Sequence, residues 1–131
     1  MSGINYWAVV VSVLIAFVVS AIYYIILNKE RAKVSPAAAS GGNRPKPTQM
    51  FAELVRSFIL AWVVAYLVGH LGITTLIDSG ELALMLWVAF PVILLSGSVM
   101  YEKVPAKLAV IHSGDWIIKL LIMTAILGSW R

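Results

Sequence analysis

The chain has 131 residues, of which 61% are hydrophobic and 12% are charged, and its mean hydropathy is +0.93. Soluble domains average about 25% charged residues, so this composition indicates a membrane protein, of a size that suits one small bundle. The absence of cysteine excludes disulfides, thiolate metal sites and thiol nucleophiles. The net charge is +4, and the basic residues flank apolar runs, which is typical of membrane topology signals and does not indicate a nucleic-acid-binding surface.

Four apolar segments each approach the length of roughly 20 residues that a helix needs to cross a bilayer. We predict helices at about 4–27, 50–71, 81–101 and 105–129, with a flexible cytoplasmic loop at 28–49, in one transmembrane domain of residues 1–131. Because lipid offers the backbone no hydrogen-bond partners, each spanning segment must be helical. The predicted fold is therefore all-α, an integral membrane four-helix bundle.

Individual residues predict where these helices begin, end or bend. Gly72 suits a left-handed cap at the end of the second helix. Asp78 and Glu81 have the spacing of an N-cap and its reciprocal acid, so we expect the third helix to begin there. Pro91 predicts a kink in the third helix, and a static kink is favoured over a transport hinge. Pro105 suits the first turn of the fourth helix.

Charge in the loops predicts the orientation. Basic residues gather in the first and third loops and are absent from the second, and they are Lys29, Arg31, Lys33, Arg44, Lys46, Lys103 and Lys107. The positive-inside rule then places both termini outside, N-out and C-out. The first loop has an alternative interpretation as a docking site for anionic lipid or a partner. Aromatic residues agree with this orientation, with Tyr6, Trp7 and Trp130 expected at the outer boundary and Tyr23, Tyr24 and Tyr101 at the inner one.

Small residues recur at every fourth position on the first two helices. These two ladders are Ala8, Ser12, Ala16 and Ser20, and Ser57, Ala61, Ala65 and Gly69. Because lipid tails are as apolar as leucine, membrane helices associate through close packing of small residues. We interpret the ladders as the helix-packing faces of one antiparallel pair; alternatively, they face a second subunit.

Ionisable residues form a stripe on the fourth helix. His112, Asp115 and Lys119 fall within an arc of roughly 60°, at roughly 100° per residue. Glu53 and Arg56 lie in the first turns of the second helix at a similar depth. We predict one polar cluster in the inner half of the bundle, made of Glu53, Arg56, His112, Asp115, Lys119 and Tyr24, with a hydrogen bond between Tyr24 and Glu53.

Two interpretations of this cluster remain open. In the structural one, Asp115 with Lys119 and Glu53 with Arg56 neutralise each other as helical pairs. In the functional one, they line a polar cavity for a proton, an ion or a small polar headgroup. We expect no metal site, because His70 and His112 should lie on the order of 20 Å apart along the membrane normal. No cofactor is expected either.

Several stretches carry a resemblance: 4–9, 20–24, 101–108, 111–114 and 125–130. In them the chain resembles a family of small bacterial four-helix membrane proteins that is known only as a domain of unknown function. The resemblance implies a helical bundle in the bacterial inner membrane, and it implies no activity. Asp115 and Lys119 stand where we expect a tyrosine and a small residue in that family, and Tyr23 stands where a tryptophan is usual.

The function expected from these patterns is that of an accessory or structural membrane subunit, packed through the small-residue faces. The alternative is an oligomeric unit that binds or transports a small solute, a lipid or a proton at the charged cluster. We expect no enzyme, because the sequence has no Gly-x-Ser-x-Gly, phosphate loop or His-Glu-x-x-His, although a lipid-modifying enzyme stays a third hypothesis. The expected location is the inner (plasma) membrane, multi-pass, and the expected partners are the bilayer and a homo-oligomer or larger membrane complex, with no nucleic acid.

Overall fold

A computed structural model describes residues 4–33 and 47–130. Its elements in chain order are α1 (Tyr6–Ile26), α2 (Asn28–Ala32), α4 (Pro47–Leu71), α5 (Leu76–Trp87), the π-helical turn η1 (Val88–Val92), α6 (Ile93–Tyr101) and α7 (Ala106–Ser129). α5, η1 and α6 follow one another without a break and form one span, Leu76–Tyr101. Among the described residues, four helical segments are therefore long and apolar enough to cross a membrane. The predicted all-α membrane fold is confirmed. The expectation of a flexible loop falls partly on residues 34–46, which lie outside the described residues.

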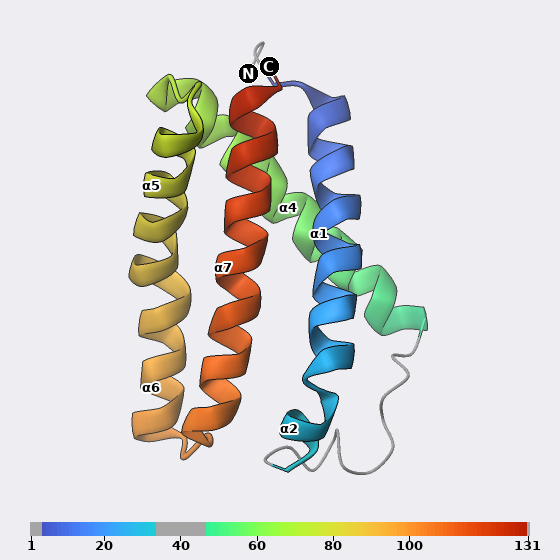
Figure 1. The fold of residues 1–131 in the computed structure, drawn as a ribbon, viewed down its shortest axis with the longest axis vertical. Coiled ribbons are helices and arrows are strands. Elements are labelled where there is room, and N and C mark those ends of the chain that lie inside the picture. Colours follow the sequence, from blue (N-terminus) through green and yellow to red (C-terminus); the bar gives the residue numbers. More distant parts are fainter. Residues whose placement is uncertain (1–3, 34–46, 131) are drawn as a thin grey trace.

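The bundle has two distinct ends (Figure 1). One end carries both termini and the connection between α4 and α5, and we call it the termini end. The other carries α2 and the connection between α6 and α7, and we call it the loop end. An ion pair from Glu30 to Lys107 joins α2 to the start of α7 at the loop end, and Lys33 also reaches Glu30, at 3.3 Å. The first predicted basic loop therefore begins beside the third, at the same end of the bundle.

Local chemistry explains two of the helix ends. The Asn5 side chain caps α1 by accepting a hydrogen bond from the Ala8 N–H at 3.2 Å. At the end of α4, Gly72 adopts a φ of +67°, and the Ile73 N–H donates to the Val68 carbonyl at 3.0 Å. This is the bond that closes a Schellman motif, so Gly72 has its predicted left-handed role.

The start of the third span differs from the prediction. The helix α5 begins at Leu76, and its N-cap is Thr75, whose hydroxyl accepts from the Asp78 N–H at 3.1 Å. Asp78 therefore lies in the first turn and does not cap the helix, and Glu81 lies further in. Thr75 and Asp78 have the same spacing as the predicted pair but lie three residues earlier in the chain. The sequence therefore offers two capping pairs, and the helix uses the earlier one.

The proline in the third span lies within a π-helical turn, η1, which contains Pro91. A proline has no N–H to donate to the preceding turn, and a wider turn is one of the few ways in which a helix can continue past it. The structure therefore has a π-helical turn at Pro91, and the predicted kink stays a prediction. Just before it, the Trp87 indole N–H donates to the Ser113 carbonyl of α7 at 2.8 Å.

The helix α7 lies at the centre of the bundle and contacts α1, α4, α5 and α6. Figure 1 shows α4 crossing obliquely behind α1 and α7. Seven of the eight ladder residues are buried within the chain: Ala8, Ser12, Ala16, Ser20, Ser57, Ala61 and Ala65. The exception is Gly69, which is exposed. Ridges spaced by four residues favour an oblique crossing, so helices packed on such ladders touch closely near one point and diverge away from it.

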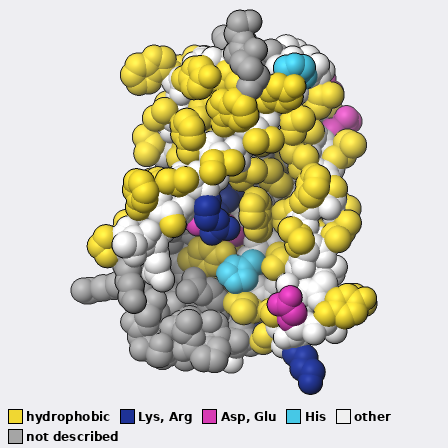
Figure 2. Space-filling view, turned by 180° about the vertical axis from the view of Figure 1, so that it is seen from behind, with side chains coloured by type: hydrophobic (Ala, Val, Ile, Leu, Met, Phe, Trp, Pro, Cys, Tyr) yellow, Lys and Arg dark blue, Asp and Glu magenta, His cyan; other side chains and the backbone are white. Residues whose placement is uncertain are grey.

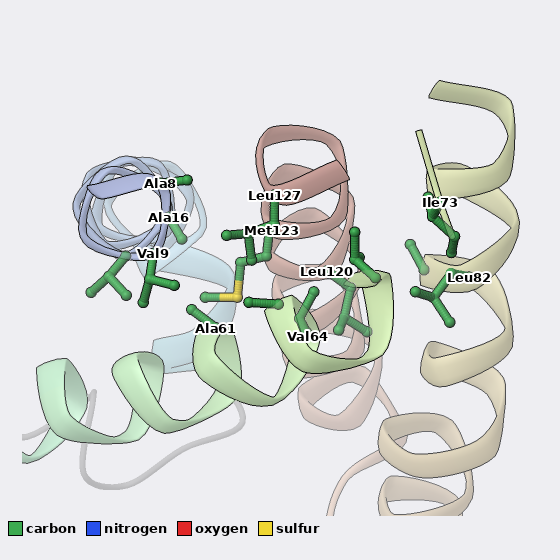
Figure 3. Close-up of a cluster of buried hydrophobic side chains, with 14 residues drawn as sticks. Ala8, Val9, Ala16, Ala61, Val64, Ile73, Leu82, Leu120, Met123 and Leu127 are labelled. Atoms are coloured by element: carbon green, nitrogen blue, oxygen red, sulfur yellow. The ribbon is translucent and has the colours of Figure 1, made fainter. Parts of the chain in front are cut away.

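Most of the buried apolar side chains lie between the crossing point and the termini end. We call this cluster the apolar core; its members are Ala8, Val9, Val13, Ala16, Ala61, Val64, Ala65, Val68, Ile73, Leu82, Ala83, Leu120, Met123 and Leu127. In Figure 3, Met123 projects from α7 toward Val9 of α1 and Ala61 of α4. Its side chain is fully buried, so three helices meet around it without a gap for water.

Candidate functional site

Five polar side chains form a continuous network across α1, α7 and α4 in the middle of the bundle. The Ser20 hydroxyl donates to one Asp115 carboxylate oxygen, and the other oxygen accepts from the Lys119 ammonium at 3.1 Å. Lys119 also donates to Glu53 at 2.9 Å. The second oxygen of Glu53 accepts from Arg56 at 3.0 Å. We call these five residues the polar network, and its two acids and two bases balance in charge.

Burial changes steadily along the polar network. The side chains of Asp115 and Lys119 are only 6% and 11% exposed, whereas that of Arg56 is 68% exposed. Glu53 lies between these extremes. Removing charges from water is costly, and the cost is offset only when the pair has good geometry and additional hydrogen bonds, which Ser20 and Glu53 supply. The network is therefore anchored at its buried end and open at Arg56.

The open end of the polar network faces a groove of about 360 Å³ between α4 and α7. The residues that line it are Glu53, Arg56, Ser57, Ile59, Leu60, Val63, Trp116 and Lys119. Lys119 also lies over the Trp116 ring, with its Nζ 5.7 Å from the ring centroid, within range of a cation–π contact. Figure 2 shows cationic, acidic and histidine side chains together in a hollow of this face, among hydrophobic side chains.

A second polar set joins α1 to α7 closer to the loop end. The Tyr23 hydroxyl donates to the Ile111 carbonyl at 2.6 Å, and the Tyr24 hydroxyl lies 2.7 Å from Nδ1 of His112. Gly114 makes room for this contact, since a Cβ there would overlap the Tyr23 hydroxyl. The loop end of the bundle thus carries a nearly unbroken series of polar contacts on α7.

The structure brings the predicted cluster together, but not in one unit. Glu53, Arg56, Asp115 and Lys119 belong to the polar network, in which the two expected helical pairs are joined through Lys119. His112 lies one turn before Asp115 on α7, and it is hydrogen-bonded to the Tyr24 hydroxyl. In place of the predicted bond between Tyr24 and Glu53, the structure gives Tyr24 a bond with His112, and Glu53 bonds with Lys119 and Arg56.

Four contacts between helices were not predicted from the sequence, those of Ser20, Tyr23, Tyr24 and Trp87. Ser20 was predicted only to pack, and Tyr23 only to lie at the inner boundary. Tyr24 was predicted at that boundary and in the polar cluster, with Glu53 as its partner. Both tyrosines are half-buried, with their hydroxyls at the Ile111 carbonyl and at His112. The indole of Trp87 had no expected partner, and it bonds the Ser113 carbonyl. The signal that could have found the Tyr23 contact is Gly114, a small residue placed next to a buried acid. The other predicted anchors, Tyr6, Trp7, Tyr101 and Trp130, are exposed.

His70 lies apart from this site, at the exposed end of α4, where its ring stacks on Tyr66 at 4.0 Å. Its Nδ1 lies 3.1 Å from the Tyr66 carbonyl. In the part of the chain that the structure describes, no three His, Asp or Glu side chains are grouped as a metal site would require. The chemistry available is therefore charge, hydrogen bonding and an apolar wall.

Comparisons with known proteins give one match. A family described as "Protein of unknown function (DUF1761)" matches residues 7–128. No curated protein and no solved structure matches the chain.

Proposed function

This chain belongs to the DUF1761 family, and we propose that it is a polytopic membrane protein that binds one small polar or amphiphilic molecule in the groove between α4 and α7. One observation carries the proposal. Arg56 lies within a membrane-spanning helix with most of its side chain exposed, and among the described residues Glu53 is its hydrogen-bonded partner. An ionisable group at such a position is expected to serve a ligand or a pathway.

The apolar core supports binding over conduction through a single chain. Between the polar network and the termini end, the buried side chains are almost all hydrophobic. The hydroxyls of Ser12 and Thr124 bond carbonyls of their own helices, Val9 at 2.9 Å and Leu120 at 2.8 Å. A polar path across the membrane would need partners that continue from one group to the next. The groove is instead a site with one open side.

Orientation, location and assembly extend the proposal. The shared side of the basic loops supports a cytoplasmic loop end with both termini outside. A bacterial inner membrane stays a prediction. We propose a non-enzymatic role, because the site offers charges and an apolar wall. Assembly into a homo-oligomer or a larger membrane complex stays a prediction.

The accessory-subunit interpretation also stays a prediction, and it needs a surface other than the ladders. Seven of the eight ladder residues are already buried against the chain's own helices. A partner subunit would therefore dock elsewhere on the bundle.

Native mass spectrometry of the protein, extracted gently from its own membrane, tests the proposal. We expect a reproducible small-molecule mass on the wild type and its loss in Arg56→Gln. The matched control is Lys103→Gln, which removes an exposed cation outside the groove and should keep the mass. A single copy attached to other subunits, with no small molecule, would contradict ligand binding and favour the accessory role. Equal retention of the mass in Arg56→Gln would also contradict it.

A further inference from the structure

We infer that the occupant of the groove is an anionic phospholipid, with its phosphate on Arg56 and one acyl chain along Ile59 and Val63. This inference rests on the proposed function and names the ligand class of the same site. Three observations support it: the hydrogen-bond donors of Arg56 that are not used by Glu53, the exposure of the groove wall, and the order of residues along α4.

The guanidinium of Arg56 provides the anion-binding group. It has five N–H donors, and among the described residues it has one hydrogen bond, from NH1 to Glu53. Its side chain is 68% exposed and lines the groove, so donors other than the one bound to Glu53 are accessible to a ligand. A phosphate diester can take two parallel N–H···O bonds from such a fork, which is the geometry that arginine recognises best.

Repulsion from the nearby acids is already offset. Each Glu53 oxygen accepts from a cation, and the Asp115 carboxylate is buried behind Lys119. The ionisable groups that line the groove itself are two cations and one acid. The polar network as a whole is neutral, so an anion at Arg56 would be held by the remaining guanidinium donors, with Glu53 as the one acid on the groove lining.

The wall of the groove is apolar and faces outward. Ile59 and Val63 are 58% and 42% exposed on α4, in a segment that spans the membrane. A ligand that enters there comes from the lipid phase, because this wall offers a water-soluble anion no hydrogen bonds. Leu60 and Trp116 close the same wall from the inner side. Together they accept a hydrocarbon chain at no cost in polar desolvation.

The order of these groups along α4 matches one leaflet. From the loop end inward, α4 presents Glu53 and Arg56 first, and Ile59 and Val63 afterwards. A phospholipid in the leaflet at the loop end has the same order, headgroup first and chain toward the midplane. A lipid of the opposite leaflet would place its chain on Arg56. The long arginine side chain can extend toward the headgroup level, as cationic side chains do in membranes.

The experiment measures lipid binding in nanodiscs by native mass spectrometry. Discs of phosphatidylcholine receive increasing fractions of phosphatidylglycerol, and bound lipids are counted after release. We expect one tightly held phosphatidylglycerol on the wild type. Its affinity should fall by roughly tenfold or more in Arg56→Gln, since charge-assisted bonds are lost.

Two bulky substitutions separate the groove from the rest of the surface. Val63→Trp fills the groove without changing charge, and we expect it to release the lipid. Val110→Trp places the same bulk on an exposed site of α7 outside the groove, and it should retain the lipid. The exposed cation change Lys103→Gln should retain it as well.

Four outcomes would overturn the inference. Inorganic phosphate alone, at millimolar concentration, would stabilise the wild type but not Arg56→Gln if the ligand were a free anion. Equal retention of phosphatidylcholine would remove the role of charge. A dimer that excludes lipid from the groove would make a second copy the occupant. If a different small molecule is lost in Arg56→Gln, the proposed function stands and the lipid inference fails, so the two failures are distinguishable.

Discussion

The two ends of the bundle are built from the same four spans, yet one is held together by apolar packing and the other by polar contacts. At the termini end, small and apolar side chains from α1, α4, α5 and α7 form one cluster, and the hydroxyls of Ser12 and Thr124 bond within their own helices. From the middle of the bundle to the loop end, charged and aromatic side chains bridge the helices, and α6 buries none of its residues. The difference follows from the oblique crossing of α4, which brings the helices close at one end and apart at the other.

The comparison teaches that packing and polarity are linked through geometry. Lipid cannot supply hydrogen bonds, so a space between diverging helices must be filled by side chains that satisfy one another or by a ligand. In the polar network, the buried side chains of Asp115 and Lys119 satisfy each other, whereas the exposed Arg56 is available to a ligand. The groove is therefore a consequence of the same ladders that close the other end.

The largest expected effect lies at the buried end of the polar network. Asp115→Asn leaves Lys119 with Glu53 as its acidic partner at a buried position, and we expect a loss of about 3 kcal/mol in unfolding free energy. Adding Lys119→Met should restore stability to within about 1 kcal/mol of the wild type, since the buried cation that lost its Asp115 partner is also removed. Denaturant unfolding in detergent micelles measures both. Losses that simply add in the double variant would show that the two residues do not act as a pair.

The next effect concerns the termini end. Met123→Ala empties a fully buried position, and we expect a loss of about 1–3 kcal/mol. The lower part of the range for core truncations applies because the separated helices would still be solvated by lipid rather than by water. Met100→Ala, on an exposed side chain of α6, should change stability very little. Similar losses in both variants, measured by the same unfolding assay, would mean that the termini end is not tightly packed.

A smaller effect is expected where α1 meets α7 through a hydroxyl. Gly114→Ala places a methyl group against the Tyr23 hydroxyl and breaks its bond to the Ile111 carbonyl, for a loss of about 1 kcal/mol. Gly97→Ala is the matched change, because a Cβ there meets no other atom within 4 Å. It should stabilise the helix slightly through propensity. Equal effects from the two alanines would argue against the Tyr23 contact.

The smallest effect is the pH dependence of the surface pair at the loop end. The hydrogen bond from Lys107, followed by that from Lys33, lowers the pKa of the Glu30 carboxyl below its ordinary value. A lowered folded-state pKa contributes stability above the ordinary pKa, and this is lost as the pH falls through the lowered value. The attachment of α2 to α7 should therefore weaken in acid. Carbon-13 titration of Glu30 should give a lower midpoint in the wild type than in Lys107→Gln, and equal midpoints would contradict the pairing.

The spans, the Gly72 cap and the two helical ion pairs could be predicted from the sequence, because each depends on local spacing. The contact between Lys119 and Glu53 and the bonds of Ser20 and Tyr23 to α7 could not be predicted, since they depend on how helices distant in the sequence cross. The ladder residues were visible in the sequence, but the groove opposite them follows only from the direction of α4. Local chemistry predicts elements, whereas crossing angles decide which polar groups meet.

The most direct test of the difference between the ends uses the absence of cysteine from the chain. Ser57→Cys and Ser12→Cys are matched, near-isosteric changes at buried serines, one lining the groove and the other in the apolar core region. Each variant is exposed, in oriented vesicles, to a membrane-impermeant thiol reagent on one side at a time. We expect labelling of Ser57→Cys from the loop side only and protection of Ser12→Cys from both sides. Labelling of Ser12→Cys from the termini side, or equal labelling of both variants, would contradict a site that is open at one end and closed at the other.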